Sequence, residues 1–193
     1  MDWALAVPAA QRDWEFAGFL DDRPAALEGY SCRFPIFGTP EGYQFTGRDR
    51  FVCAIGDART RLRFCRGLNA RRARFISLIH PSAIVGSNSE VGEGCILCPN
   101  SIITNNVRIG SFVILNAYSS VGHDAVLGDG CTLSGHADVT GGVVLGEGVF
   151  MGSHASILPR TKVGDYAVIG AGSVALKKVK SGTTVFGVPA IEM

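Results

Sequence analysis

The second half of the chain carries an aliphatic residue or methionine at every sixth position, without a break from Val85 to Ile169. The fifteen members are Val85, Val91, Leu97, Ile103, Ile109, Leu115, Val121, Leu127, Leu133, Val139, Leu145, Met151, Ile157, Val163 and Ile169. A fixed period is typical of repeat architectures, so this pattern predicts a stack of similar rungs.

A second column of residues lies four positions after each aliphatic residue. Its members are small or β-branched: Ser89, Cys95, Ser101, Val107, Val113, Ser119, Ala125, Cys131, Ala137, Val143, Val149, Ala155, Thr161, Ala167 and Ser173. Alternate residues of a strand face the same side. Each six-residue rung is therefore predicted to point one aliphatic and one small residue inward.

Glycine recurs with a period of eighteen, at Gly92, Gly110, Gly128, Gly146 and Gly164. Three six-residue rungs would form one coil, with a corner at the same place in each coil. Glycine suits a corner that needs a positive φ, which is the conformation we expect for these five residues. The sequence predicts a triangular prism of three parallel sheets, with about five coils stacked about 4.8 Å apart.

Residues 1–80 lack this periodicity. Apolar segments at 14–20 and 51–57 are predicted strands, residues 58–72 a basic amphipathic helix, and residues 74–79 a third strand. Strand, helix and strand in this order predict a small parallel α/β unit. His80-Pro81 marks the expected boundary between a domain of residues 1–80 and a domain of residues 81–193.

The expected α/β unit lacks the strand and Gly-rich loop with which nucleotide-binding units begin. The chain opens on a short apolar segment, Trp3 to Val7, which resembles the end of a helix. We expect either that the natural reading frame extends upstream by roughly 25–30 residues with such a loop, or that the element was lost. Asp21 and Asp22 would hold a ribose in a nucleotide fold or open a surface turn, and their residue types do not decide between the two.

The composition excludes several classes of protein. The 193 residues are 47% hydrophobic and 18% charged, which is not the composition of a disordered chain. A net charge of +1 gives no reason to expect a nucleic acid or an anionic membrane as partner. The chain has no long apolar stretch and no secretion signal. Its six cysteines are therefore predicted to be reduced thiols in a cytoplasmic protein.

The thiols of Cys95 and Cys98 are predicted to diverge, which argues against a zinc site at this pair.

Several short motifs together resemble one family. They are Gly18-Phe19-Leu20-Asp21-Asp22, Ala54-Ile55-Gly56-Asp57, Ile79-His80-Pro81-Ser82-Ala83, Asn116 with Val121-Gly122-His123-Asp124, and Val185-Phe186-Gly187-Val188-Pro189-Ala190. They resemble the bacterial sugar-nucleotide acetyltransferases that make bacillosamine, perosamine and sialic-acid-type surface sugars. The resemblance implies a truncated Rossmann-like nucleotide-sugar-binding domain followed by a left-handed parallel β-helix, assembled as a homotrimer with acetyl-CoA between subunits.

The resemblance also implies catalytic residues. His123 would be the general base, Asp124 would orient its ring, and Asn116 would contact substrate or water. An amine that attacks a thioester must lose a proton, and a neutral imidazole suits that task near neutral pH. A thioester is already activated, so no metal is expected. Backbone amides would receive the developing oxyanion.

The resemblance places cofactor contacts at Thr132, Gly152, Ser153 and Ala171, and substrate contacts at Asp21, Asp22 and Gly56. His136 and His154 fall in one eighteen-residue column with Asn100, Tyr118 and Gly172. This column is either a ladder of polar rings about 5 Å apart or a surface that contacts CoA.

Four functions remain to be weighed. The leading one is N-acetylation of a nucleotide-linked 4-amino-4,6-dideoxy sugar, and O-acetylation of a sialic-acid-type or other sugar is the alternative in the same class. A β-helical zinc carbonic anhydrase needs three converging histidines, and the spacings of His123, His136 and His154 do not fit one. A degenerate trimeric scaffold that still binds CoA is the non-enzymatic alternative.

Overall fold

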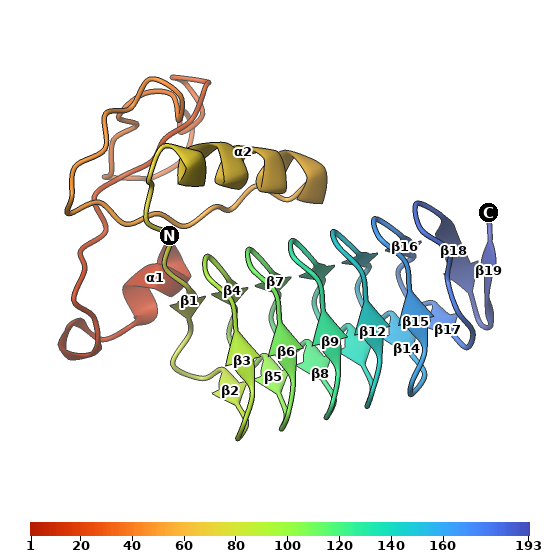
Figure 1. Cartoon of the computed structure of the whole chain (residues 1–193). Coiled ribbons are helices and arrows are strands. Elements are labelled where there is room, and N and C mark those ends of the chain that lie inside the picture. Colours follow the sequence, from red (N-terminus) through yellow and green to blue (C-terminus); the bar gives the residue numbers. More distant parts are fainter.

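The protein consists of an irregular first part, residues 1–77, and a long coil, residues 78–193 (Figure 1). The structure is a computed structural model and describes residues 1–193 apart from the side chain of Gln11. The first part contains α1 (Asp2–Ala6), a 3-10 turn (Ala9–Gln11) and α2 (Ala58–Ala70). No helix in the described part of the chain has the length and apolar character needed to cross a bilayer.

The coil is built from three sheets. The first sheet contains β1 (Leu78–Ile79), β4 (Ile96–Leu97), β7 (Ile114–Leu115), β10 (Thr132–Leu133), β13 (Phe150–Met151), β16 (Val168–Ile169), β18 (Thr184–Gly187) and β19 (Ala190–Glu192). The second contains β2 (Ile84–Val85), β5 (Ile102–Ile103), β8 (Ser120–Val121), β11 (Asp138–Val139), β14 (Ser156–Ile157) and β17 (Val174–Ala175). The third contains β3 (Glu90–Val91), β6 (Arg108–Ile109), β9 (Val126–Leu127), β12 (Val144–Leu145) and β15 (Lys162–Val163).

From β1 to β18, each strand pairs in parallel with the strand one coil away. Leu133 of β10, for example, lies between Leu115 and Met151, each eighteen residues distant. The three predicted parallel sheets are thus confirmed. The predicted number of coils was too low: the β-helix has about six turns, because β1 already pairs with β4 and the last turn extends to β18. The handedness stays a prediction from the resemblance.

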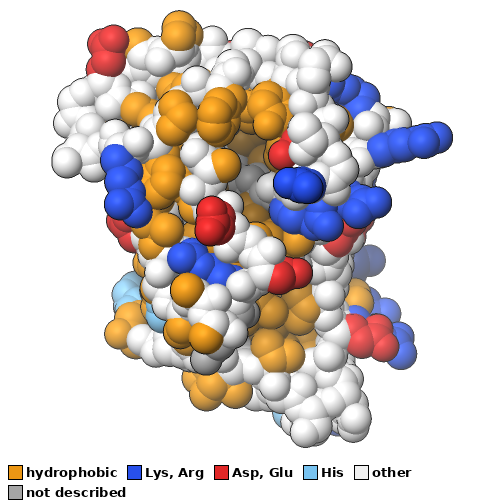
Figure 2. Space-filling model, turned by 90° about the vertical axis from the view of Figure 1, so that its left-hand side faces the viewer, with side chains coloured by type: hydrophobic (Ala, Val, Ile, Leu, Met, Phe, Trp, Pro, Cys, Tyr) orange, Lys and Arg blue, Asp and Glu red, His pale blue; other side chains and the backbone are white. Residues whose placement is uncertain are grey.

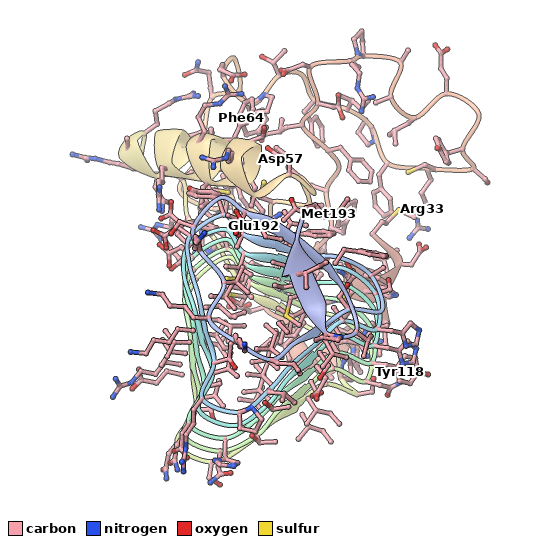
Figure 3. The ribbon with its side chains drawn as sticks, turned by 90° about the vertical axis from the view of Figure 1, so that its right-hand side faces the viewer. Arg33, Asp57, Phe64, Tyr118, Glu192 and Met193 are labelled. Carbon is pink, nitrogen blue, oxygen red and sulfur yellow. The ribbon has the colours of Figure 1, made fainter. Side chains whose placement is uncertain are left out.

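The two predicted inward columns form the core of the β-helix. From Leu97 to Ile169 every sixth residue is at most 4% exposed, and the small residues between them are buried as well. The two ends of the coil differ. At the start, Ile84 and Val85 are 58% and 40% exposed, and Figure 2 shows hydrophobic side chains on this face. At the other end, β18 and β19 pair antiparallel and lie across the last coil (Figure 3).

The recurring glycines have a different role from the one expected. None of Gly92, Gly110, Gly128, Gly146 and Gly164 has a positive φ, so that expectation was wrong. A Cβ at Gly128 would lie 2.6 Å from the carbonyl carbon of Gly146 and 2.7 Å from its oxygen. These glycines are required because the next coil's backbone passes too close for any side chain. The positive φ occurs two positions later, for example at Gly130 (+66°).

The predicted helix is confirmed as α2, and it ends two residues earlier than expected. The Asp57 side chain caps it by accepting a hydrogen bond from the backbone N–H of Thr60 at 2.8 Å. The prediction of regular strands at 14–20 and 51–57 was wrong. Each segment forms a single parallel bridge, Phe19 with Ile36 and Phe51 with Phe75.

Aromatic packing stabilises these extended segments. They therefore do not need the longer row of backbone hydrogen bonds that a regular strand makes. Phe45, Phe51, Phe75 and Phe112 form a chain of ring contacts with centroids 5.1–6.1 Å apart, which leads from residues 1–77 onto the β-helix. The segment predicted as a third strand, 74–79, divides between the Phe75 bridge and β1, which belongs to the first sheet of the β-helix. The division into domains at residue 80 stays a prediction.

Helix α2 lies along the coils, parallel to their stacking direction (Figure 1). The Asn69 amide donates to Glu93 at 2.7 Å, Arg66 pairs with Glu147 and Asp129, and the Arg59 guanidinium lies 3.7 Å from the Tyr166 ring centroid. Positions from the end of the helix to its start thus contact successively later coils. The ten residues from Arg59 to Asn69 rise about 15 Å and the four coils from Glu93 to Tyr166 about 19 Å, and the long side chains span the difference.

Candidate active site

The corners of the β-helix carry the candidate site residues. We call residues 98–101, 116–119, 134–137, 152–155 and 170–173, between the first and second sheets, the first corner. The second corner, between the second and third sheets, comprises residues 86–89, 104–107, 122–125, 140–143 and 158–161. The third corner, between the third and first sheets, comprises residues 92–95, 110–113, 128–131, 146–149 and 164–167.

His123 and Asp124 form an exposed pair at the second corner. The Nδ1 atom of His123 lies 2.8 Å from Oδ2 of Asp124, and the two side chains are 66% and 60% exposed. A carboxylate that accepts a hydrogen bond from Nδ1–H leaves the lone pair on Nε2. In this arrangement the lone pair on Nε2 is available at an exposed corner of the β-helix.

The backbone and the preceding coil hold Asp124 in place. Asp124 has a φ of +59°, in the left-handed region that non-glycine residues seldom adopt. The hydrogen bond with His123 lowers the pKa of the Asp124 carboxyl, and a hydrogen bond from the Asn106 side chain lowers it further. The Asp124 carboxylate is thus kept ionised beside His123.

Gly141 is a functional candidate that the sequence analysis missed. A Cβ at this position would lie 2.6 Å from Nε2 of His123 and 2.8 Å from Cε1. The imidazole therefore lies directly against the backbone of the following coil, in space that only glycine leaves open. The available signal was the Gly141-Gly142 pair, one coil of eighteen residues after His123-Asp124.

Within one chain the structure does not bring Asn116 next to His123. Asn116 follows β7 and lies at the first corner, whereas His123 follows β8 and lies at the second corner. The Asn116 Nδ2 atom donates to the backbone carbonyl of Leu133 at 3.0 Å. Asn116 shares its corner with three of the four expected cofactor positions, Gly152, Ser153 and Ala171.

The first corner presents a row of free backbone donors. In the described chain, the N–H groups of Ala117, Gly135, Ser153 and Ala171 have no hydrogen-bond acceptor, and one occurs in each successive coil. A Cβ at Gly152 would lie 2.5 Å from the Ala171 nitrogen, so this residue must be glycine for the coils to stack. The corner can therefore bind a long ligand that carries carbonyl groups.

A ladder of rings stands beside these donors. Tyr118 and His136 stack with centroids 5.0 Å apart, and His136 and His154 with centroids 4.7 Å apart, both at 3° between planes. The three rings thus form the predicted ladder, and contact of this column with CoA stays a prediction. Figure 3 looks along the coils and shows Tyr118 at one corner, while α2, which carries Phe64, lies outside another part of the triangle.

Thr132, the fourth expected cofactor position, lies elsewhere. It belongs to β10, is 5% exposed, and its hydroxyl accepts a hydrogen bond from Nη2 of Arg61 at 2.8 Å. This hydroxyl therefore serves the contact between α2 and the β-helix.

The three expected substrate residues make separate contacts. Asp21 accepts hydrogen bonds from the backbone and side chain of Arg23, which lower the pKa of its carboxyl. Gly56 precedes α2, and its carbonyl accepts from Nη1 of Arg61 at 3.0 Å. Among the described residues, no hydrogen bond or ion pair joins Asp21 or Asp22 to Gly56.

The cysteines are free and mostly buried. As predicted, the thiols of Cys95 and Cys98 diverge: Cys95 belongs to the core of the β-helix and Cys98 to a separate cluster with Ile96 and Ile114. Burial raises the pKa of Cys95 to about 11 and that of Cys98 to about 12. The described residues contain no group of three or more His, Cys, Asp or Glu placed to hold a metal ion.

Comparisons with known proteins agree with this geometry. Residues 142–176 match the family described as bacterial transferase hexapeptide (six repeats). Over 90 residues the chain is 32% identical to the UDP-N-acetylbacillosamine N-acetyltransferase of Bacillus subtilis, which is 46% of this chain and 42% of that protein. The match thus spans less than half the length of this curated relative.

Solved structures also match over most of the chain, among them those of PerB and of a PglB domain. PerB from Caulobacter crescentus, in complex with CoA and GDP-perosamine, is 30% identical, with 91% of this chain and 84% of that chain covered and a TM-score of 0.81. The acetyltransferase domain of PglB from Neisseria gonorrhoeae is 26% identical, with 100% and 92% covered and a TM-score of 0.88. The chain therefore belongs to the bacterial sugar-nucleotide acetyltransferases of the hexapeptide-repeat superfamily.

Proposed function

We propose that the protein transfers an acetyl group from acetyl-CoA to the amine of a nucleotide-linked 4-amino-4,6-dideoxy sugar, with His123 as the general base. The His123–Asp124 hydrogen bond of 2.8 Å at an exposed corner is the observation that carries this proposal. The solved complex of PerB with CoA and GDP-perosamine supports the pairing of these two ligand classes in a protein of this family.

The proposed reaction is a direct transfer. The amine nitrogen attacks the thioester carbonyl carbon, forming the C–N bond. His123 Nε2 accepts the proton that nitrogen loses, and Asp124 stabilises the resulting imidazolium through Nδ1–H. The C–S bond then breaks, and the CoA thiolate leaves and receives a proton. Because the thioester is already activated, positioning and proton transfer supply the catalysis.

The row of free donors at the first corner would hold acetyl-CoA. Pantetheine carries two amide groups, and N–H groups repeated every coil, as at Ser153 and Ala171, match such a chain of carbonyl acceptors. His123 lies at a different corner of the same chain. We therefore propose a homotrimer in which the first corner of one subunit faces the second corner of its neighbour, so that each active site forms between two subunits.

Residues 1–77 would bind the nucleotide part of the sugar acceptor, as a Rossmann-like unit. Gly56 lies where a strand-like segment turns into α2, and a Cβ there would meet no atom within 4 Å, so its surroundings are open. Asp21 and Asp22 lie at the end of the Phe19 bridge, where acids of nucleotide folds hold a ribose.

A panel of acceptors tests the proposal. We expect release of free CoA thiol when the purified protein receives acetyl-CoA with GDP-, UDP- or dTDP-linked 4-amino-4,6-dideoxy sugars, and mass spectrometry should show one added acetyl group on nitrogen. If only hydroxyl acceptors react, the protein is an O-acetyltransferase. If CoA binds and no acceptor in the panel turns over, the scaffold alternative replaces the proposal.

Two variants test the role of His123. His123→Asn should lower kcat by about 10²–10⁴-fold, the usual contribution of a general base. Gly141→Ala keeps the base and places a methyl group against its ring, so kcat should fall while KM for acetyl-CoA stays the same. Gly67→Ala on the exposed face of α2 is the control and should leave kcat unchanged. A His123→Asn rate within a few-fold of wild type would exclude His123 as the base.

A further inference from the structure

Arg61 is a cation buried completely between α2 and the β-helix, at 0% exposure. Its Nη1 donates to the carbonyls of Ile55 at 2.6 Å and Gly56 at 3.0 Å. Its Nε donates to the carbonyl of Phe112 at 3.0 Å, and its Nη2 to the carbonyl of Gly130 at 2.7 Å. All three guanidinium nitrogens are therefore bonded.

No carboxylate in the described chain pairs with this guanidinium. Burial lowers the pKa of Arg61, yet an arginine side chain stays charged in proteins. Its charge is balanced by backbone carbonyl dipoles and by the Thr132 hydroxyl. A cation so costly to bury indicates a requirement for its fixed, forked geometry, since an apolar side chain would fill the same space without that cost.

The partners of Arg61 come from two sides. Ile55 and Gly56 form the turn that leads into α2, whereas Phe112, Gly130 and Thr132 belong to two neighbouring coils of the β-helix. One planar group thus fixes the distance and orientation between the turn before α2 and the coils.

We propose that Arg61 is a positioning residue that holds the Gly56 turn in register with the β-helix and thereby sets the affinity for the nucleotide sugar. This inference rests on the proposed function, in which Gly56 contacts that substrate. Arg61 itself touches no reacting atom, because the protein surrounds it on every side.

Lysine cannot replace this group. Its single ammonium donates from one point, whereas the partners of Arg61 lie on both sides of a planar fork. Arg61→Lys keeps the charge and most of the volume and leaves at least some of the Ile55, Gly56, Phe112 and Gly130 carbonyls without a donor. The turn would then move relative to the coils, while the corners that carry His123 and the free N–H groups stay as they are.

Steady-state kinetics of Arg61→Lys test the proposal. Loss of a buried, charge-assisted hydrogen bond should raise KM for the nucleotide sugar about tenfold or more. We expect kcat and KM for acetyl-CoA to stay within about threefold of wild type, because neither depends on the Gly56 turn. The matched control is Arg66→Lys, on the same helix and against the same coils, which lacks any bond to the turn and should change no constant. Equal changes in both KM values, or none, would overturn the proposal.

Hydrogen exchange provides a readout that does not need turnover. The amides of residues 55–60 should exchange faster in Arg61→Lys than in wild type, and those of residues 120–126 at an unchanged rate. If Arg61→Lys does not fold, Thr132→Val removes one acceptor and should raise exchange of the same turn; unchanged exchange there would also overturn the role. Failure of the wild-type protein to acetylate any amino sugar would instead reject the proposed function.

Discussion

The β-helix of residues 78–193 repeats the same parallel backbone pairing in every coil, whereas residues 1–77 contain one long helix and two single parallel bridges. In the β-helix, the loss of one contact leaves similar contacts above and below it. Residues 1–77 have only a few such contacts, and none of them is repeated. Several of these contacts join the region to the coils, including those of Arg61, Arg66 and Asn69.

The comparison shows how a small unit with little sheet of its own can be stabilised by a regular neighbour. Leu62, Cys65, Ala73 and Phe75 form one buried cluster with Phe112 of the β-helix. The outward Ile96 and Ile114 of the first sheet are 8% and 9% exposed. Farther along the same sheet, Phe150 is 39% exposed. Residues 1–77 therefore depend on the β-helix for part of their core, while the later coils need no such cover.

The largest expected effect is in the core of the β-helix. Leu133 is 0% exposed and lies between Leu115 and Met151. Leu133→Ala should lower the free energy of unfolding by about 2–5 kcal/mol, through lost burial and the cavity that remains. Urea denaturation followed by circular dichroism measures this change. A loss below about 1 kcal/mol would mean that neighbouring coils collapse into the gap.

The second-largest loss of stability is expected at a corner glycine. A Cβ in Gly128→Ala would meet the Gly146 backbone at 2.6 Å, and the next coil would have to move. We expect a loss of about 1–3 kcal/mol in the free energy of unfolding, as for overpacked cores. Differential scanning calorimetry should show a lower transition temperature.

The control for this change lies on α2. Gly67 is exposed and has no atom within 4 Å of an added Cβ, so Gly67→Ala should stabilise the protein by about 0.5–1 kcal/mol through helix propensity. The same chemical change is thus expected to have opposite signs in the two regions. Destabilisation by both would show that the corner clash is not the cause.

The helix cap should have a smaller, local effect. Asp57→Ala removes the acceptor for the Thr60 N–H and should cost about 1 kcal/mol. Because the cap belongs to residues 1–77, limited proteolysis should cleave that region faster and leave the coils intact. Asp57→Asn, which also accepts the bond, is the matched control.

The smallest effect concerns the pair between α2 and the third corner. The hydrogen bond from Arg66 lowers the pKa of Glu147, and one from Tyr166 lowers it further. A carboxyl whose pKa is lower in the folded state stabilises the fold above its ordinary pKa, and this stabilisation is lost as the pH falls through the folded-state value. Glu147→Gln should cost at most about 1 kcal/mol at pH 7.

At about pH 3, urea denaturation should find the wild type and Glu147→Gln closer in stability than at pH 7, since protonation removes the same charge. A difference that does not change between these two pH values would show that the charge of Glu147 contributes nothing to the attachment of α2.

The sequence predicts the β-helix well because its signal is periodic. Leu133 belongs to a series with fifteen members, so one ambiguous residue does not change the conclusion. Residues 14–20 and 51–57 carry only an apolar run, which an extended segment packed through Phe51 and Phe75 shares with a strand. Their bridges depend on partners distant in sequence, which no local pattern reveals.

The same distinction holds for the candidate site. The pairing of His123 with Asp124 could be predicted because the two are adjacent, whereas Gly141 lies eighteen residues away and contacts the ring only once the coils stack. The positive φ was expected at the recurring glycines because corners favour it, and it lies two residues later, at positions occupied by Gly130 and even Phe112. Residue 128 must be glycine because the backbones of neighbouring coils approach closely there. This approach cannot be seen in the sequence.

The contacts of α2 with several successive coils limit how this architecture can grow. One extra coil between Glu93 and Tyr166 would add about 4.8 Å beneath the helix and shift the partners of Arg59 and Arg66 by one position. About three further helical residues would restore the register. In relatives, the length of this helix should therefore vary together with the number of coils beneath it, whereas coils added after Tyr166 leave the helix unconstrained.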